Sequence, residues 1–264
     1  MPSSQTLVLM YHGLSGRHAA PESADPHYTL PTVRFCAQLD ALTAAGFGVG
    51  CLRDRERPET SRDVVLTFDD GDLSNYTEAF PALLERGLSA DFFVNPERVG
   101  RPGFCTWLQL REMADAGMSI QSHGMTHTYF THLDRRALTD ELRRSKSAIE
   151  EQIAQPVTLL APPGGRCPRG LAALAQAQGY RTVLGSVPGV AMPPFADGRI
   201  LPRVALTAAH DVASVLHWAQ GGAAALRGLR TRYAALALAK RLFGDRGYER
   251  LREALLSRRA SVTP

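Results

Sequence analysis

The sequence lacks long apolar runs, and none approaches the ~20 residues that a membrane-spanning helix needs. The first five residues carry no positively charged side chain. The apolar run that follows them, 7–10, is too short for the core of a signal peptide. We therefore expect a cytoplasmic protein with neither a signal peptide nor a transmembrane segment.

Cysteine is scarce and scattered. The chain contains four cysteines and no Cys-x-x-Cys pair, which argues against a structural zinc site and favours buried, reduced thiols. Hydrophobic residues make up 44% of the chain and charged residues 21%, as in ordinary soluble globular proteins. The cysteines are Cys36, Cys51, Cys105 and Cys167.

Positive charge is concentrated at one end of the chain. Residues 227–264 contain ten Arg or Lys and three Asp or Glu, whereas the whole chain has a net charge of only +4. The remainder is therefore net acidic, and we expect no nucleic acid partner, because such partners require a basic surface.

The basic tail also has apolar residues at helical spacing, and two interpretations remain open. The first is a helical extension packed on the main domain with a solvated basic face. The second is contact with a membrane surface or a lipid-linked sugar. The apolar residues are Leu229, Tyr233, Leu236 and Phe243, and the basic ones are Arg230, Arg232, Lys240 and Arg241.

Strand and helix patterns alternate along most of the chain, which favours parallel βα units, an α/β fold and a barrel-like closure of seven or eight strands. We expect a main domain at 1–206 and a helical extension at 207–264. The expected strands are 6–13, 47–52, 64–68, 89–94, 118–122, 157–161, 180–184 and 200–206. The expected helices are 32–45, 76–86, 106–116, 134–155, 168–179, 211–220 and 227–259.

The apolar strand 64–68 ends in two adjacent carboxylates, Asp69 and Asp70, followed by Gly71. Neighbouring carboxylates repel each other unless a cation or a proton lies between them. Successive side chains of a strand point to opposite sides, so the two cannot have the same role. One of them can bind a metal while the other handles protons. The alternative is a strand that simply ends in an acidic turn.

Histidines follow two other expected strands. His12 ends the first strand, and His123 and His127 come just after strand 118–122. On a helical turn, residues four apart share a face and can bind one ion, although many such pairs are solvated surface residues. In a barrel the carboxyl ends of the strands converge. Two histidines and one carboxylate would then form a hydrolytic metal site with open positions.

These motifs resemble those of the polysaccharide deacetylases of carbohydrate esterase family 4, over residues 6–206. Thr67-Phe68-Asp69-Asp70-Gly71 is similar to the first motif of the family, and Ser122-His123-Gly124-Met125-Thr126-His127 is similar to the second. Segments 90–94 and 106–117 also follow the spacing of the family. The resemblance implies a distorted (β/α) barrel of about seven parallel strands.

The resemblance also implies a reaction and a set of roles. Asp69 would be the general base, and Asp70, His123 and His127 would hold a divalent metal, zinc first, with cobalt, manganese or nickel as alternatives. The implied reaction removes an N-acetyl group from an amino sugar. The substrate would be a polysaccharide, an oligosaccharide or a lipid- or nucleotide-linked precursor.

The third motif departs from the family pattern, Arg-x-Pro-aromatic-Gly. Here it reads Ala161-Pro162-Pro163-Gly164-Gly165, so both the arginine that would brace the catalytic aspartate and the aromatic residue are missing. Arg166 or Arg203 can replace the lost charge, and we favour Arg203, in the expected last strand. We assign substrate binding to the turn of Pro163, Gly164 and Gly165.

The Leu-x-His motif that usually supplies the general acid is also missing after residue 206, and His217, in an expected helix, is a poor substitute. One subset of the family takes this histidine from an N-terminal strand. His12 is placed as in that subset, so we assign the acid to His12.

Two rival functions remain open. The first is an amide or formyl hydrolase of the same superfamily that acts on a different substrate. The second is a degenerate sugar-binding module, although such a module has no need of two carboxylates and two histidines together.

Overall fold

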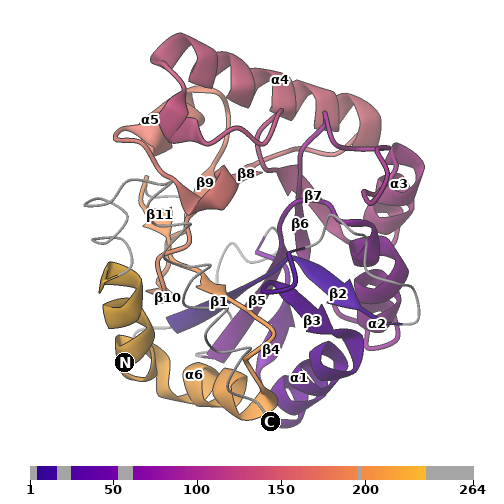
Figure 1. Cartoon of the computed structure of the whole chain (residues 1–264), viewed down its shortest axis with the longest axis vertical. Helices are drawn as coiled ribbons and strands as arrows, with labels where there is room; N and C mark the ends of the chain where they lie inside the picture. The colour runs from indigo at the N-terminus through magenta and orange to yellow at the C-terminus, as the bar shows by residue number, and fades with distance from the viewer. Residues whose placement is uncertain (1–4, 17–24, 53–61, 196–197, 236–264) are drawn as a thin grey trace, which may run out of the picture.

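The computed structural model describes residues 5–16, 25–52, 62–195 and 198–235. In these residues the strands form a ring with the helices on its outer side, as Figure 1 shows. The expected α/β class and barrel-like parallel sheet are confirmed. None of the helices in the described part of the chain has the length and apolar character needed to cross a membrane.

The main sheet has the strand order β10-β1-β5-β6-β7-β8-β9-β11, and in addition β12 pairs with β1 and β4 with β5. All of these pairings are parallel except that of β10 with β1. The strands are β1 (Gln5–Tyr11), β4 (Gly48–Gly50), β5 (Arg62–Phe68), β6 (Asp91–Val94), β7 (Ser119–Ser122), β8 (Leu159–Leu160), β9 (Thr182–Leu184), β10 (Val190–Ala191), β11 (Ile200–Leu201) and β12 (Val204–Ala205).

Neighbouring residues of the strands belong to two different apolar clusters. Val8, Val65 and Phe93 belong to a small buried cluster that also includes Ala161. Neighbouring strand residues such as Leu9 and Leu66 belong to the larger cluster shared with the helices. Successive strand side chains point to opposite faces, so the near-continuous apolar strands can fill both regions.

The expected last strand, 200–206, is interrupted. It forms two short strands, β11 and β12, with Pro202 and Arg203 between them. β11 pairs with β9 and β12 pairs with β1, so the segment connects the two ends of the sheet and nearly closes the barrel. Our expectation that Arg203 lies within a strand is therefore wrong, because proline cannot donate to a strand ladder and the chain changes partner at this point.

The helices agree with the sequence pattern at most positions. Thr106 caps α3 in a capping box with Gln109, and Asp134 caps α4. The expected inward residues of α4, Leu138, Leu142, Ser145 and Ile149, are buried. The helices are α1 (Thr32–Ala44), α2 (Phe80–Leu84), α3 (Trp107–Asp115), α4 (Arg135–Ile153), α5 (Leu171–Ala177) and α6 (Val212–Ala225).

Several elements differ from expectation. The expected helix 76–86 begins as a π-helical segment, Asn75–Ala79, before α2, whose first turn contains Pro81. Two short strands, β2 (Gly13–Ser15) and β3 (Thr29–Pro31), form a separate parallel pair that the sequence pattern did not indicate.

The carboxyl-terminal extension is described only in part. α6 packs against α1 and β1, and residues 227–235 are helical. Leu229 packs against the main core. Leu236, Lys240, Arg241 and Phe243, on which the membrane interpretation depends, lie outside the described residues. The extension as a separate unit, and its contact with a membrane or lipid-linked sugar, stay predictions.

Candidate active site

The residues singled out from the sequence follow three parallel strands of the barrel. His12 follows β1, Asp69 and Asp70 follow β5, and His123 follows β7. The ladder continues past the strand ends, because the Asp69 backbone N–H donates to the Tyr11 carbonyl at 3.0 Å. The carboxyl ends of these strands therefore bring the side chains to one end of the barrel.

Asp70, His123 and His127 form a compact group of nitrogen and oxygen atoms. Oδ1 of Asp70 lies 3.3 Å from Nε2 of His123 and 2.8 Å from Nε2 of His127. One atom from each residue lies within 4.8 Å of the other two, so the group can hold a metal ion. Two imidazoles and a carboxylate suit zinc and related divalent metals.

The Asp70 carboxylate supports this fit. Its Oδ1 is buried and lies 3.3 Å from Nε2 of His123, a nitrogen whose hydrogen is on Nδ1, so two acceptors face each other there. A cation held by the three side chains would satisfy this oxygen. Asp70 and His127 also have positive φ angles, 77° and 67°, which are uncommon for residues other than glycine. Such backbone strain is concentrated at functional sites.

The segment from His123 to His127 is an irregular loop rather than the helical turn that we expected. Gly124 has a φ of 79° and turns the chain immediately after His123. The Asn95 side chain donates to the carbonyls of both His123 and Gly124. Glu141 accepts from the Thr126 backbone N–H at 2.7 Å. These buried side chains replace the missing helical hydrogen bonds.

Each histidine of the pair has a defined partner for its Nδ1. Nδ1 of His123 lies 2.8 Å from the carbonyl oxygen of Ala161, and this hydrogen bond fixes the hydrogen on Nδ1 and leaves Nε2 facing Asp70. His127 is different, since its Nδ1 lies 2.7 Å from Nη2 of Arg98. Arg98 was not expected from the sequence.

Charge and burial shift the acidity of these groups. Burial by itself raises the pKa of Asp70, but the two neighbouring imidazoles outweigh it and hold that pKa well below its ordinary value. Burial lowers the pKa of His127, and contact with Asp70 offsets this only in part. Asp70 is therefore ionised and His127 neutral near pH 7, which are the forms that bind metal.

Asp69 is held by Arg203. Nη1 and Nη2 of Arg203 donate to the two oxygens of Asp69 at 2.7 and 2.8 Å. The guanidinium also donates to the Gly185 carbonyl and to Oγ1 of Thr67, and it lies over the Phe93 ring. Burial raises the pKa of Asp69, but the Arg203 charge outweighs it, so the net shift is downward.

Of the two arginines considered in place of the missing motif arginine, Arg203 reaches Asp69. Arg166 lies instead over the Tyr129 ring, 4.2 Å from its centroid. Ala161, at the position of the motif arginine, is fully buried in the same apolar cluster as Phe93.

His12 lies beside this site. Its ring is 4.7 Å from the Tyr28 ring, and Asn75 donates to its carbonyl oxygen at 2.7 Å. Its Nδ1 is buried without a hydrogen-bond partner among the described residues. A positive charge on His12 lowers the pKa of both Asp69 and Asp70. The alternative acid, His217, is exposed on α6.

The turn of Pro163, Gly164 and Gly165 is a short 3₁₀ helix in which both glycines have positive φ, 61° and 64°. A Cβ on Gly164 would lie 2.7 Å from Cε1 of Tyr129, and one on Gly165 would lie 1.8 Å from Oγ of Ser186. The missing motif aromatic therefore has no room at position 164, because Tyr129 already lies against it.

The sequence interpretation missed Arg98, Asn95, Glu141 and Tyr129. Asn95 was accessible to the same reasoning, because it directly follows β6 as Asp69 follows β5. The other residues lie in loops or on a helix, where no local pattern marks them.

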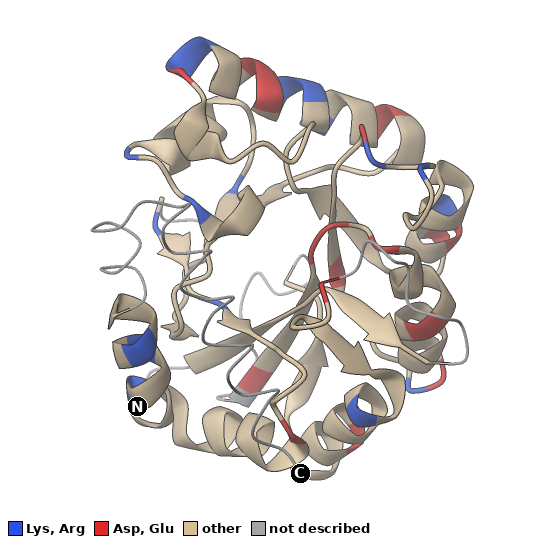
Figure 2. Ribbon diagram, in the orientation of Figure 1, with Lys and Arg blue, Asp and Glu red and all other residues tan. Residues whose placement is uncertain are grey.

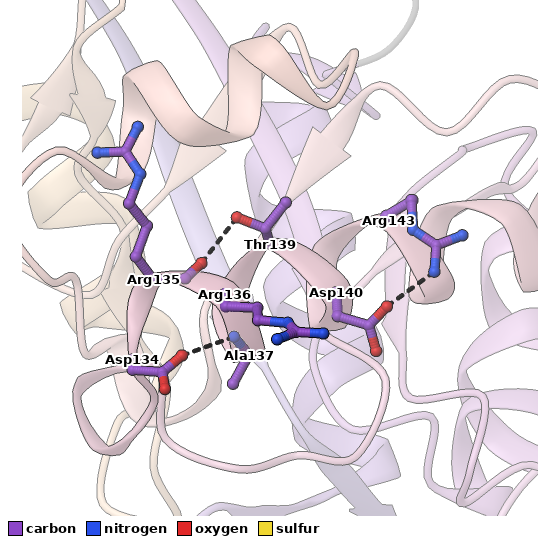
Figure 3. A pocket seen from close by; sticks show the side chains of 7 residues that line it. All are labelled: Asp134, Arg135, Arg136, Ala137, Thr139, Asp140 and Arg143. Carbon is purple, nitrogen blue, oxygen red and sulfur yellow. Dashed lines mark hydrogen bonds and ion pairs between the residues drawn. The ribbon is translucent and has the colours of Figure 1, made fainter.

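A surface pocket lies apart from this site. Figure 3 shows it on the first turns of α4, where Asp140 pairs with Arg143 at 2.7 Å. Figure 2 shows Lys or Arg alternating with Asp or Glu along this helix, as on a solvated helix face. The pocket shares no residue with the site; its lining residues are Asp134, Arg135, Arg136, Ala137, Thr139, Asp140 and Arg143.

Comparison with known proteins agrees with the geometry. Over residues 56–183 the chain matches the family described as polysaccharide deacetylase. YxkH of Bacillus subtilis (strain 168), whose name refers to the same activity, is 27% identical over 190 residues. The matched segment of the chain corresponds to a polysaccharide deacetylase domain. The YxkH match covers 70% of this chain and 65% of YxkH, so the chain spans less than two thirds of that relative.

Solved structures share the deacetylase fold. The Streptococcus pyogenes deacetylase PplD, in complex with acetate, has a TM-score of 0.72 and 22% identity, covering 81% of this chain and 97% of its own. IcaB from Ammonifex degensii has a TM-score of 0.71 and 26% identity, covering 82% of this chain and 97% of its own. Most of the described barrel therefore corresponds to a complete deacetylase fold.

Proposed function

We propose that the protein is a metal-dependent hydrolase that removes N-acetyl groups from an amino sugar in a polysaccharide, an oligosaccharide or a lipid- or nucleotide-linked precursor. The observation that carries this proposal is the division of the two adjacent carboxylates. Asp70 lies against His123 and His127, whereas Asp69 is held by Arg203. The deacetylase domain supports the same reaction class.

Asp70, His123 and His127 would hold the cation, and zinc is the first choice, with cobalt, manganese and nickel as alternatives. The mixed nitrogen and oxygen donors, and the two acceptors that face each other between Asp70 and His123, support this assignment. A divalent cation in this position supplies Lewis acidity, which polarises an amide carbonyl and makes water more acidic.

Asp69 is the general base in this proposal. It must be ionised to take a proton from the attacking water, and the Arg203 guanidinium keeps it ionised despite its burial. The bidentate contact also fixes the plane of the carboxylate. Because its pKa is lowered, Asp69 is a weaker base than a free aspartate, but it is in the ionised form that can accept a proton.

His12 is the general acid. An amine leaves an amide readily only if it is protonated, so hydrolysis of this bond requires a proton donor. The Asn75 contact to its backbone and the Tyr28 ring beside its side chain position the imidazole. We assign the turn of Pro163, Gly164 and Gly165 to substrate binding, since it follows Ala161, whose carbonyl oxygen contacts Nδ1 of His123 in the proposed metal site.

An acetate-release screen tests this function. The full chain, freed of metal by a chelator, would be assayed with added Zn²⁺, Co²⁺, Mn²⁺ or Ni²⁺ on mono-, oligo- and nucleotide-linked N-acetyl sugars. Metal-dependent acetate release that is lost in Asp69→Asn supports the proposal. Formate release, or release from non-sugar amides alone, would favour the rival hydrolase. Sugar binding without any release would favour the binding module.

A further inference from the structure

Arg98 lies close to two of the three residues of the proposed metal site, Asp70 and His127. It follows β6, which lies between β5 and β7 in the sheet, so its loop separates the loops that carry Asp70 and His127. Nη2 of Arg98 is 2.7 Å from Nδ1 of His127, and Nη1 is 3.9 Å from Oδ1 of Asp70. The Phe104 ring, 5.4 Å away, supports the guanidinium.

The contact with His127 fixes which ring nitrogen carries the hydrogen. A guanidinium has only donors, so Nδ1 of His127 must accept. In a neutral imidazole the hydrogen is then on Nε2, which faces Asp70 at 2.8 Å. A nitrogen that carries a hydrogen has no lone pair for a metal. If His127 binds through Nε2, its hydrogen moves to Nδ1, where it meets the Arg98 donor.

The positive charge of Arg98 also opposes binding of a cation. Its guanidinium approaches the Asp70 oxygen that the cation would use, and two positive groups compete for one carboxylate. His123 has no such conflict, because the Ala161 carbonyl keeps the hydrogen on its Nδ1.

We propose that Arg98 is a positioning residue that competes with the cation for His127 and Asp70, so that metal binding requires its side chain to leave Nδ1 of His127. This inference rests on the proposed metal site. The Arg98 side chain is 30% exposed, which leaves it room to move toward solvent. Arg98 therefore sets how tightly the chain holds its cation.

Metal titration of the full chain tests this proposal. Zn²⁺ would be titrated by calorimetry into the chelator-treated wild type, Arg98→Met and Arg101→Met. Methionine keeps part of the stem and removes the donors. Arg101 is an exposed arginine of the same segment, so its variant controls for the change in net charge. We expect Arg98→Met to bind Zn²⁺ on the order of ten- to hundredfold more tightly, the strength of one charge-assisted hydrogen bond.

Equal or weaker binding by Arg98→Met, or an equal gain in Arg101→Met, would overturn the proposal. Binding of Zn²⁺ by neither the wild type nor Arg98→Met would overturn the metal site and this inference with it. Binding with equal affinities would refute only the inference. Acetate release is not used as a readout, so the two failures remain distinguishable.

A second measurement needs no variant. In protein with ¹⁵N-labelled histidine, we expect Nδ1 of His127 to be the unprotonated nitrogen without metal and the protonated one with Zn²⁺. His123 should keep its hydrogen on Nδ1 in both states. A hydrogen on Nδ1 of His127 in the metal-free wild type would contradict the proposal, whatever the stability of the variants.

Discussion

The Arg203 guanidinium donates to both oxygens of the Asp69 carboxylate, although 134 residues separate the two in the chain. The Arg203 side chain is fully buried and that of Asp69 is 4% exposed. Arg203 lies where the chain passes from β11 to β12 and nearly closes the barrel. One ion pair therefore joins the closure of the barrel to the proposed catalytic base.

Removing one partner of this ion pair should lower the stability of the fold. Arg203→Met leaves Asp69 buried without its cation, and we expect a loss of about 3–5 kcal/mol in the free energy of unfolding. Urea unfolding followed by circular dichroism measures this loss. Arg169→Met, at an exposed position, is the control and should change stability by less than about 0.5 kcal/mol.

The double variant Asp69→Asn/Arg203→Met should recover part of this stability, because it leaves neither charge unpaired. It should remain inactive, since it lacks the base. A double variant as unstable as the sum of the two single ones would show that the two side chains are not coupled.

The ionisation of Asp69 predicts a pH dependence of stability. Its pKa is below the ordinary value in the folded chain, whereas an unfolded aspartate titrates near pH ~3.9. The unfolded state therefore takes up a proton first as the pH falls. The stability that Asp69 contributes is present above pH ~5 and is lost as the pH falls through its folded pKa.

Comparison with Asp69→Asn isolates this effect. The difference in unfolding free energy between wild type and variant should be constant from pH 7 to about 5 and should shrink below about 4. A difference that grows as the pH falls would mean that the folded pKa is raised rather than lowered.

Replacement of His12 separates proton donation from other roles. We expect His12→Gln to lower kcat/KM on the N-acetyl sugar by about 10²–10⁴. The loss should be much smaller on an aryl acetate ester, whose phenolate leaves without a proton. An equal loss on both substrates would argue against the acid role, and a change of only a few-fold on the sugar would exclude it.

Removal of the metal should abolish turnover. We expect a chelator to stop acetate release and added Zn²⁺ or Co²⁺ to restore it. His123→Ala should lower the bound metal per chain, measured by mass spectrometry, whereas His132→Ala, an exposed histidine in the nearby 3₁₀ helix Phe130–His132, should not. Activity that survives complete removal of the metal would exclude a metal-dependent reaction.

The glycine turn offers a matched pair of substitutions. Gly164 and Gly87 have φ angles of 61° and 63°, so alanine strains the backbone equally at both. A Cβ has open space at Gly87 but meets the Tyr129 ring at Gly164. We expect Gly164→Ala alone to raise KM severalfold and to cost about 1–3 kcal/mol more in stability. Equal effects of the two substitutions would show that the contact with Tyr129 does not cause the loss.

Much of the candidate site could be predicted from the sequence. Residues 67–71 and 122–127 follow apolar strands, and parallel strands bring their carboxyl ends together. Adjacent strand residues point to opposite sides, so the separation of Asp69 from Asp70 follows from local geometry. The strand patterns and the motifs were enough to predict the barrel and the family.

The irregular loops of the site could not be predicted from the sequence. The loop from His123 to His127 depends on contacts from Asn95 and Glu141, and Arg98 reaches His127 only because β6 lies between β5 and β7. These contacts come from side chains distant in the chain, and no local periodicity encodes them.

The sequence alone determined the barrel and which side chains stand at its strand ends, because alternation and strand order are local and repetitive properties. The resemblance of its motifs to the family also implied that Ala161 leaves a positive charge to be supplied from elsewhere. Only the tertiary structure decided between Arg166 and Arg203, and placed Arg98 beside His127. The physical reason is that a buried charge takes its partner from whichever segment the closed barrel brings within hydrogen-bonding distance.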